Sequence, residues 1–465
     1  MIDLAHFTGQ KMALFGLGTS GCASAQALLA SGVDVIGFDD DAARCQAAKE
    51  ANIPIADLRG EDWKKFHALV LTPGVPLTHP KPHWSVEQAR QAGVDIIGDI
   101  ELFVRARRAF LQKNNLTPYD LPLIAITGTN GKSTTTALLA YLLNQAGFDA
   151  QMGGNIGTPI LSLAPFKKGL PYVVECSSFQ IALAPSLNPT YGILLNITPD
   201  HIDRHGDFVT YAALKGRLVK HANHAFIGID DVPSAALYQC LYEKGHQVTA
   251  LTKNGPHPYA LYSQGCRLFA PSQTTALADL GKNTALRGSH NAQNALAAVG
   301  VMSALGMRNS CLQTGLDHFS GLPHRLQQVG QRGDVIFIND SKATNAEAVA
   351  PALDTFNNIY WIAGGVAKEG GITTLRPYFS KIRKAYLIGE AAPLFARQIG
   401  RAFPFIQAHN LKSAVKAAAN DAQKDPTGKK AVLFSPACAS YDQYPNYSAR
   451  GDAFITHINQ FLRQS

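Results

Sequence analysis

The sequence has few cysteines and no long apolar stretch. Its seven cysteines are widely spaced along 465 residues, with no Cys-x-x-Cys pair and no Cys/His spacing typical of a zinc site. Isolated cysteines in odd number are typical of reduced thiols rather than of a disulfide framework. No apolar stretch approaches the roughly 18 residues of a membrane-spanning helix, and the N-terminus MIDLAHFTGQK lacks the parts of a signal peptide. We therefore expect a cytoplasmic protein with no membrane partner.

Charge is also sparse, because only 16% of the residues are charged whereas 46% are hydrophobic. A disordered chain would have the opposite balance. The 42 Lys and Arg exceed the 34 Asp and Glu, and the net charge of +8 favours anionic ligands. The basic residues are scattered rather than clustered, so we expect no nucleic-acid partner.

Short β-branched runs alternate with Ala- and Leu-rich helical stretches along most of the chain. Examples are KMALFGLG, LPLIAITG, YVVECSS, VIFINDS and KAVLFSP. This rhythm is typical of parallel, doubly wound α/β sheets, whose ligands bind beyond the carboxyl ends of the strands. The length suggests about three domains, and two seams divide the chain into 1–99, 100–321 and 322–465. We expect two Rossmann-like outer domains and a central P-loop-type ATPase domain with a mostly parallel sheet.

The first predicted domain opens with a glycine-rich loop. Gly16-Leu17-Gly18-Thr19-Ser20-Gly21 follows the run KMALF, and Asp39 ends the next predicted strand. This pattern indicates a Rossmann phosphate loop, in which glycines let the backbone approach a pyrophosphate at a helix N-terminus. A complete dinucleotide fold needs two such halves, whereas only about 100 residues precede the next phosphate loop. A nucleotide diphosphate therefore suits the domain better than NAD, and the loop at Gly74 could flank the same ligand; a plain tight turn is the alternative.

The strongest motif lies in the second predicted domain. Gly128-Thr129-Asn130-Gly131-Lys132-Ser133-Thr134 follows the run LIAI and precedes the helical stretch TTALLAYLLNQAG. Backbone N–H groups of such a loop bind phosphate oxygens, while Lys132 can reach the β- and γ-phosphates and Ser133 can ligate Mg²⁺. The motif lacks two residues of the usual spacing before its second glycine, but strand, glycines, lysine, hydroxyl and helix occur together. It predicts an ATP site.

Acidic and imidazole side chains follow two further strands of this domain. Glu175 ends the run YVVE, and Asp200, His201 and Asp203 follow YGILLNI. Both strand ends should lie on the side of the phosphate loop, where these groups could hold Mg²⁺. His201 and His205, four residues apart, could instead bind zinc, although no third ligand is evident.

Three other residues of this domain allow two interpretations each. Asn291 and Asn294 lie three apart, so their amides share a helix face and could either bind ATP or only cap and bridge helices. Lys215, in the predicted helix YAALKGRLV, is typical of an exposed surface lysine when judged from spacing alone.

The third predicted domain places charged and hydroxyl side chains at its entry and in loops after strands. These residues are Arg325, Asp340, Lys342, Lys368 and Ser440. Loops with several cations suit a small polyanion, such as an amino-acid dicarboxylate or a transferred phosphate. Each one alone could be a solvated surface group, but all lie where such sheets bind ligands.

Together these motifs resemble the Mur ligases, the ATP-dependent amide-forming enzymes of peptidoglycan synthesis. The resemblance rests on GTNGKST, NITPDHIDRH, GSHNAQNALAA and LPHR, which are also similar to folylpolyglutamate synthases. NDSKATN, SPACASYDQYPNYSARG, TPGVPLTHP and GDIELF look like the branch that adds D-glutamate. The resemblance implies a monomeric cytoplasmic ligase that adds D-glutamate to UDP-N-acetylmuramoyl-L-alanine through an acyl phosphate, using ATP and two Mg²⁺ ions.

The resemblance also implies a role for each matching residue. Catalytic roles fall to Lys132, His201 and Lys215. The residues implied to contact ATP are Gly128, Thr129, Asn130, Gly131, Lys132, Ser133, Thr134, Asn291, Asn294, Arg325 and Asp340. Those implied to bind the UDP substrate are Gly18, Thr19, Ser20, Asp39, Gly74, Asn155 and His201. Glutamate would meet Lys342, Thr344, Lys368, Ser440 and Tyr447, and metal would meet Ser133, Glu175, His201 and, once carbamylated, Lys215.

Two departures from the family pattern concern the substrate contacts. Tyr447 stands where the family commonly has Phe, and Asp40 and Asp41 stand where other polar residues are usual. Three rival functions stay open. An NAD-dependent oxidoreductase rests on GLGTSG alone, a non-catalytic regulator would bind ATP without releasing ADP, and a folylpolyglutamate-type ligase leaves the first nucleotide loop unexplained.

Overall fold

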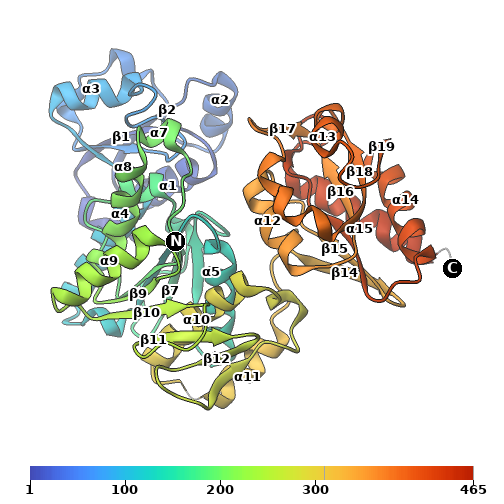
Figure 1. The fold of residues 1–465 in the computed structure, drawn as a ribbon. Coiled ribbons are helices and arrows are strands. Elements are labelled where there is room, and N and C mark those ends of the chain that lie inside the picture. Colours follow the sequence, from blue (N-terminus) through green and yellow to red (C-terminus); the bar gives the residue numbers. More distant parts are fainter. Residues whose placement is uncertain (308, 464–465) are drawn as a thin grey trace. The chain divides into compact units, whose positions relative to one another are not determined.

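The protein, represented by a computed structural model, is described for residues 1–307 and 309–463. It divides into two compact units. The first unit holds Met1–Asp279 and Gln293–Leu316, and the second holds Leu280–Ala292 and the chain from Asp317 onward. Both units consist of mostly parallel sheets with helices packed beside them, which confirms the mixed α/β class (Figure 1).

The first unit begins with a four-stranded parallel sheet in the order β2-β1-β3-β4. Strand β3 is the buried run ALVL, as is typical of a parallel sheet covered on both faces. The strands are β1 (Lys11–Phe15), β2 (Asp34–Phe38), β3 (Ala68–Leu71) and β4 (Asp95–Ile97). The helices of this part are α1 (Thr19–Ala30), α2 (Ala42–Glu50), α3 (Trp84–Ala92) and α4 (Asp99–Lys113).

A nine-stranded sheet follows, in the order β13-β12-β11-β10-β9-β8-β5-β7-β6. Along this order, neighbouring strands from β11 to β6 pair in parallel, whereas β12 pairs antiparallel with both β11 and β13. The strands are β5 (Leu123–Thr127), β6 (Gln151–Gly154), β7 (Tyr172–Glu175), β8 (Tyr191–Leu194), β9 (His224–Gly228), β10 (Val248–Thr252), β11 (Ala260–Gln264), β12 (Arg267–Phe269) and β13 (Ala276–Asp279). The helices are α5 (Lys132–Gln145), α6 (Ser178–Ala182), α7 (Ile202–His205), α8 (Phe208–Lys220), α9 (Val232–Glu243), α10 (Ser289–Ala304) and α11 (Asn309–His318).

The second unit contains a six-stranded sheet in the order β14-β15-β20-β16-β18-β19 and a small antiparallel pair, β17-β21. Only β14 is antiparallel within the larger sheet. The strands are β14 (Gln327–Arg332), β15 (Val335–Asn339), β16 (Ile359–Gly364), β17 (Val366–Ala367), β18 (Ile382–Ile388), β19 (Phe405–His409), β20 (Lys430–Phe434) and β21 (Cys438–Ala439). The helices are α12 (Ala346–Thr355), α13 (Ala392–Ile399), α14 (Leu411–Lys424) and α15 (Tyr447–Arg463).

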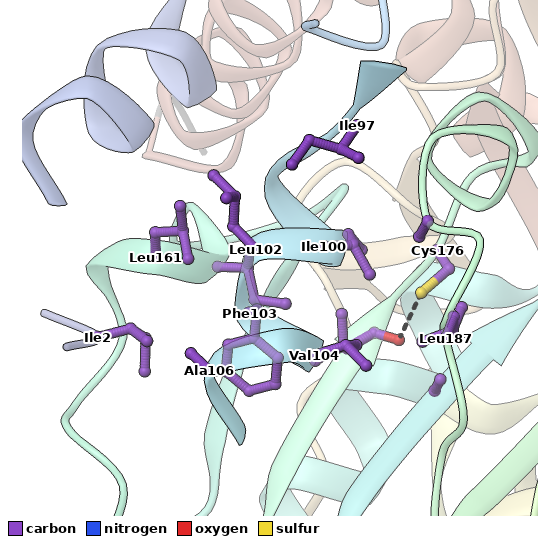
Figure 2. Packing of buried hydrophobic residues seen from close by; sticks show 14 of the residues in the cluster. Ile2, Ile97, Ile100, Leu102, Phe103, Val104, Ala106, Leu161, Cys176 and Leu187 are labelled. Atoms are coloured by element: carbon purple, nitrogen blue, oxygen red, sulfur yellow. Dashed lines mark hydrogen bonds between the residues drawn. The ribbon is translucent and has the colours of Figure 1, made fainter. Parts of the chain in front are cut away.

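Helix α4 joins the two sheets of the first unit through one hydrophobic core. Its side chains Ile100, Phe103 and Val104 are buried with Ile2 of the N-terminus and Leu161 of the segment after β6, as Figure 2 shows. The same cluster includes residues of β1 and of β5. The same packed core therefore supports the two glycine-rich loops that follow β1 and β5.

In the part of the chain that the structure describes, no helix combines the length and apolar character required to cross a membrane.

Candidate active site

The loop after β1 depends on closely packed glycines. Gly16 has φ +98°, in the left-handed region, and a Cβ on Gly21 would collide with the Gly16 carbonyl oxygen. The buried Asp39 carboxylate accepts a hydrogen bond from the Leu17 backbone N–H at 2.7 Å. Gly18 precedes α1, and a Cβ there would meet no atom within 4 Å. Asp39 thus holds the shape of a loop whose open side lies at Gly18.

The first turn of α1 and the segment after β2 border this loop. Thr19 is exposed and Ser20 half-buried in that turn, where backbone N–H groups are available to an anion. Asp40 accepts a hydrogen bond from Arg59 at 2.6 Å and is bonded to the His83 ring at 2.9 Å. The Arg59 guanidinium also lies 4.4 Å from the centre of the Trp84 ring. Asp40 therefore fixes a cation–aromatic network that sequence patterns did not predict.

The predicted ATP loop connects β5 to α5. Gly128 has φ +153° and Gly131 has φ +87°, so both glycines adopt backbone conformations that other residues rarely accept. The Lys132 ammonium donates hydrogen bonds to the carbonyl oxygens of Gly128 and Thr129, each at 2.8 Å. Ser133 and Thr134 lie in the first turn of α5, whose N-terminal dipole favours phosphate. Strand, loop and helix thus have the arrangement that the motif predicted.

The side chains of Asn196 and Asn294 both contact this loop. The Asn130 backbone N–H donates to the Asn196 side-chain oxygen at 2.9 Å, and Asn196 donates to Gln293 at 3.3 Å. Gln293 in turn donates to Asp230 at 3.1 Å. A Cβ on Gly131 would collide with the Asn294 side-chain oxygen, so Asn294 packs directly against the loop.

Asn291 has different surroundings, because its amide donates to the Arg287 carbonyl oxygen at 2.9 Å. The role of Asn291 in ATP binding stays a prediction.

Glu175 and Asn155 meet at the ends of β7 and β6. The Glu175 carboxylate is 2% exposed, and its Oε1 accepts a hydrogen bond from the Asn155 amide at 2.8 Å. Its Oε2 is buried and has no hydrogen-bond partner. A buried carboxylate oxygen without a donor is costly unless a cation or a proton satisfies it. Together with the buried hydroxyl of Ser133, this oxygen makes a donor set that fits Mg²⁺, which usually combines one or two carboxylates with phosphate oxygens.

Lys215 is not the surface lysine that spacing alone suggested. Its side chain is 2% exposed, and its ammonium donates to the Gly128 carbonyl oxygen at 2.7 Å. Burial, and then the nearby Lys132 charge, lower the pKa of Lys215 well below its usual value, while Asp200 and Glu175 oppose this shift. The structure thus brings both predicted catalytic lysines and two predicted carboxylates into one electrostatic neighbourhood.

His201 lies on a strained turn in front of α7. Its φ is +53°, and its side chain is 49% exposed with Nε2 3.5 Å from the Asp200 carboxylate. Three residues later, in the short helix itself, Arg204 donates to the Gly74 carbonyl oxygen at 3.1 Å. Gly74 of the loop after β3 is therefore joined to the turn that carries His201.

His205 points inward and packs against neighbouring side chains. Its ring is hydrogen-bonded to the Ser178 hydroxyl at 2.8 Å and stacks on Phe179, and burial lowers the pKa of His205 to about 4. In the described residues no three His, Cys, Asp or Glu side chains gather as a metal-binding group, so the zinc alternative gains no third ligand. His205 and Arg204 line a cavity of about 210 Å³ together with Pro73 and Val75 of the loop after β3.

In the second unit, Asp340 lies at the end of β15 and is buried. Its carboxyl group accepts hydrogen bonds from the Ser435 hydroxyl at 2.7 Å and from the Leu326 backbone N–H at 3.2 Å. Burial raises the pKa of Asp340 to about 7. Asp340 thereby fixes the backbone next to Arg325, so these two predicted ATP residues are neighbours.

The predicted glutamate residues are brought together by the loops after β15, β17 and β21. The Lys342 ammonium donates to the Tyr447 hydroxyl at 3.0 Å. Lys368 directly follows β17, which pairs with β21 just before Ser440. Thr344 is half-buried in the loop that carries Lys342. Four of the five residues therefore belong to loops of one unit, and the fifth, Tyr447, begins α15 of the same unit.

A buried arginine, which sequence patterns did not single out, joins these loops. Arg450 is 1% exposed and donates to the Ser341 hydroxyl at 3.1 Å and to the Ser341 carbonyl oxygen at 2.9 Å. It also donates to the carbonyl oxygens of Cys438 at 3.0 Å and Ala439 at 3.2 Å. One guanidinium thus fastens the segments before Lys342 and before Ser440.

Replacing Arg450 by lysine is expected to destabilise the second unit. An ammonium cannot reproduce a planar fork that serves four acceptors, and each buried acceptor left without a donor costs about 1–3 kcal/mol. We expect a loss of about 2–4 kcal/mol of unfolding free energy, measured as a lower denaturation midpoint. Arg401→Lys, at an exposed position, is the control; equal midpoints for the two variants would contradict the assigned role of Arg450.

Comparison with protein-family models and known proteins shows which family the chain belongs to. Residues 126–302 match the Mur ligase middle domain, and residues 324–438 match the Mur ligase, glutamate ligase domain. The chain is 57% identical over 462 residues to the UDP-N-acetylmuramoylalanine–D-glutamate ligase of Bartonella henselae, covering 99% of both chains. It is 54% identical to the enzyme of the same name from Rhizobium meliloti, covering 98% of both. The chain belongs to the Mur ligase family.

Solved structures agree with this Mur ligase in fold. The UDP-N-acetylmuramate–alanine ligase of Thermotoga maritima has a TM-score of 0.55 at 17% identity, covering 98% of this chain and 100% of that one. A D-alanyl-D-alanyl-adding ligase from Acinetobacter baumannii has a TM-score of 0.54 at 18% identity, covering 76% of this chain and 78% of that one. These structures share the fold, and the relatives and family models confirm the family recognised from the motifs.

Several structural contacts of this Mur ligase escaped the motif analysis. Asn196 and Gln293 lie inside quoted motifs, but nothing in their spacing indicated that they join the ATP loop to Asp230. Arg450 stands three residues after Tyr447 in α15, so about one helical turn separates them. Their proximity on the helix could therefore have been predicted from this spacing.

Proposed function

We propose that this Mur ligase adds D-glutamate to UDP-N-acetylmuramoyl-L-alanine, with conversion of ATP to ADP and phosphate, in the cytoplasmic synthesis of peptidoglycan precursor. The observation that carries the proposal is the match, over nearly the whole length of both chains, to relatives named for this reaction. The cluster of half-buried Lys132 with buried Lys215 and Glu175 beside the phosphate loop supports it.

We propose three domains with separate tasks, at 1–99, 100–321 and 322–465. Their support is that each range contains its own sheet, of four, nine and six strands. The first would bind the UDP moiety at Gly18, Thr19, Ser20 and Asp39, the second ATP, and the third glutamate. Gly74, Asn155 and His201 would bind the rest of the UDP substrate, and the cavity beside the loop after β3 adjoins Gly74 through Arg204. We also propose that the protein acts as a monomer.

The proposed reaction has two steps. A carboxylate oxygen of the UDP substrate attacks the γ-phosphorus of ATP, the bond from that phosphorus to the bridging oxygen breaks, and ADP leaves. The neutral amine of glutamate then attacks the acyl carbon, the bond from that carbon to the phosphate oxygen breaks, and the nitrogen releases a proton. Lys132 would stabilise charge on the phosphoryl oxygens, because a cation fixed at that point acts in a site with little water.

Magnesium would be held by Ser133 and Glu175, with His201 and Lys215 at a second site. Bound Mg²⁺ would supply positive charge to the phosphoryl oxygens. Burial lowers the pKa of Lys215 and so favours its neutral amine, a nucleophile whose nitrogen can attack CO₂, lose a proton and become a carbamate. That change would replace a cation by an oxygen ligand, which suits the Lys132 charge nearby.

The ATP contacts would come from Gly128–Thr134, Asn294, Arg325 and Asp340. Asn291, whose amide also donates to the Arg287 carbonyl oxygen, would contribute to the same contacts. Glutamate would be bound by Lys342, Thr344, Lys368, Ser440 and Tyr447, as its two carboxylates require cations and hydroxyls.

The test is phosphate release from ATP and Mg²⁺ in the presence of UDP-N-acetylmuramoyl-L-alanine, with D-glutamate and L-glutamate added in parallel. We expect release that depends on D-glutamate. Release only with L-glutamate would keep the reaction and overturn its specificity. No release with either would overturn the assigned substrates.

A further inference from the structure

Arg204 links two segments of the first unit that are far apart in the sequence. Its guanidinium donates to the Gly74 carbonyl oxygen at 3.1 Å and so holds the loop after β3. Its backbone N–H donates to the His201 carbonyl oxygen at 3.0 Å and so closes the turn in which His201 has φ +53°. One residue therefore contacts both the loop of Gly74 and the turn of His201.

The ring of Phe179 supports this link. The guanidinium carbon of Arg204 lies 5.0 Å from the centre of the Phe179 ring. The centre of the His201 ring lies 5.1 Å from the same point, and His205 stacks on it at 4.9 Å. Phe179 belongs to α6, whose N-terminus is fixed by a capping box. The guanidinium and the His201 imidazole therefore rest on one ring that a capped helix holds in place.

The loop after β3 also contacts the first glycine-rich loop and the end of α7. A Cβ on Gly16 would collide with the Thr72 hydroxyl, so Thr72 packs directly against the loop after β1. A Cβ on Gly206 would collide with the His79 ring, so the later part of the loop after β3 packs against the end of α7. The loop after β3 thus touches both the proposed UDP site and the helix that begins after His201.

Stability alone does not account for the arrangement of Arg204. The side chain is half-buried, and its Nε–H is buried with no hydrogen-bond partner, which costs free energy. The described contacts of the guanidinium are with a neutral carbonyl oxygen and an aromatic face rather than with a carboxylate. Such contacts fix the position of the side chain without neutralising its charge.

We propose that Arg204 is a positioning residue that couples binding of the UDP substrate at the loop after β3 to the placement of the His201 imidazole. A substrate bound at Gly74 fixes the carbonyl oxygen that holds the guanidinium, and the guanidinium fixes the ring on which His201 packs. Without Arg204 the free protein has His201 in place for a smaller fraction of the time, and the apparent affinity for the substrate falls by that fraction. The inference rests on the proposed function and adds to it a residue outside the assigned substrate contacts.

The test measures binding of UDP-N-acetylmuramoyl-L-alanine by calorimetry, without turnover, to wild type and to Arg204→Met. Methionine keeps a long side chain that packs on an aromatic ring, but it cannot donate to Gly74. We expect the Kd to rise about tenfold, which is typical of coupling between two sites. In the phosphate-release assay the KM for the UDP substrate should rise by a similar factor. The kcat and the KM values for ATP and D-glutamate should stay within about twofold, because saturating UDP substrate restores the placement of His201.

Arg90→Met is the matched control. Arg90 is exposed and donates to the Leu77 carbonyl oxygen at 3.3 Å, so it holds the same loop through the same kind of bond, but from α3 rather than α7. Its Kd should stay within about twofold of the wild-type value. An equal loss in both variants would mean that anchoring of the loop alone sets the affinity, and the inference would be wrong. Arg204→Lys keeps a donor and the charge, so it should recover part of the affinity; it replaces Arg204→Met in the comparison if the melting temperature shows that variant to be unfolded.

A double-mutant cycle tests whether Arg204 acts through His201. His201→Asn should itself weaken binding of the UDP substrate, and adding Arg204→Met to it should cause no further loss. Losses that multiply, or an unchanged Kd in the Arg204 variants, would overturn the inference alone while wild-type binding stands. Wild type that does not bind UDP-N-acetylmuramoyl-L-alanine would overturn the proposed function and this inference with it.

Discussion

Lys132→Ala is expected to lower kcat by at least about 10³-fold while the protein remains folded. The side chain lies at the start of α5 and its ammonium is held against the carbonyl oxygens of Gly128 and Thr129, inside the loop that would bind the phosphates. Electrostatic stabilisation of a transition state by one fixed group is typically worth this much. Phosphate release with all three substrates present measures the effect.

The control for Lys132→Ala is Lys113→Ala, at the exposed end of α4. Circular dichroism and the melting temperature should be the same for both variants and wild type, because the Lys132 ammonium donates to carbonyl oxygens of the loop at its own helix start, which the backbone can still form without it. Normal turnover in Lys132→Ala would remove the main support for the ATP site.

Lys215→Met is expected to lower turnover by about 10²–10³-fold. Methionine fills a buried space of similar length without a charge, so packing is retained while any metal ligand formed on the lysine is lost. The buried amine donates to the Gly128 carbonyl oxygen, and its low pKa favours the neutral form that reacts with CO₂. Phosphate release again provides the measurement, and intact-protein mass in bicarbonate should show the carbamate on wild type but not on the variant.

The matched control for Lys215→Met is Lys220→Met, the same substitution at an exposed position of α8. Its turnover should equal that of wild type. If Lys215→Met turned over normally, or if wild type in CO₂-free buffer kept full activity with no carbamate mass, the proposed ligand role of Lys215 would be wrong.

The sequence was most informative where backbone conformation dictates residue type. The glycines at 128 and 131 have positive φ values, and Gly21 has no room for a Cβ. Only glycine therefore fits at these positions of the two loops. A constraint of that kind leaves a fixed spacing in the sequence, and both loops were therefore predicted in their correct positions between strand and helix.

The burial of Lys215 was harder to predict, although a signal was present. Tyr211, Leu218 and Val219 stand four residues before, three after and four after Lys215, and all are buried on α8. That helical spacing places Lys215 on the apolar face. Lysine side chains are usually exposed because burying their charge is costly. That general expectation outweighed the evidence of the helical spacing.

Contacts between distant segments could not be predicted from local patterns. The bond from Arg204 to Gly74 joins residues 130 positions apart, and that from Lys342 to Tyr447 joins residues 105 apart. Likewise, the buried face of α4 packs into a core that includes residues of β1 and of β5. Such pairings depend on how the sheets assemble, which no single stretch of sequence encodes.

The Arg450 contacts have a consequence for how this region can vary among relatives. Two of the bonds of its guanidinium end on main-chain oxygens of Cys438 and Ala439. Substitutions at 438 and 439 by residues of similar size therefore keep the two carbonyl oxygens that accept from Arg450. Position 450 has no such freedom, since no other side chain carries the same planar set of donors. An alignment of relatives should show arginine retained at 450 even where its neighbours across the loop have drifted.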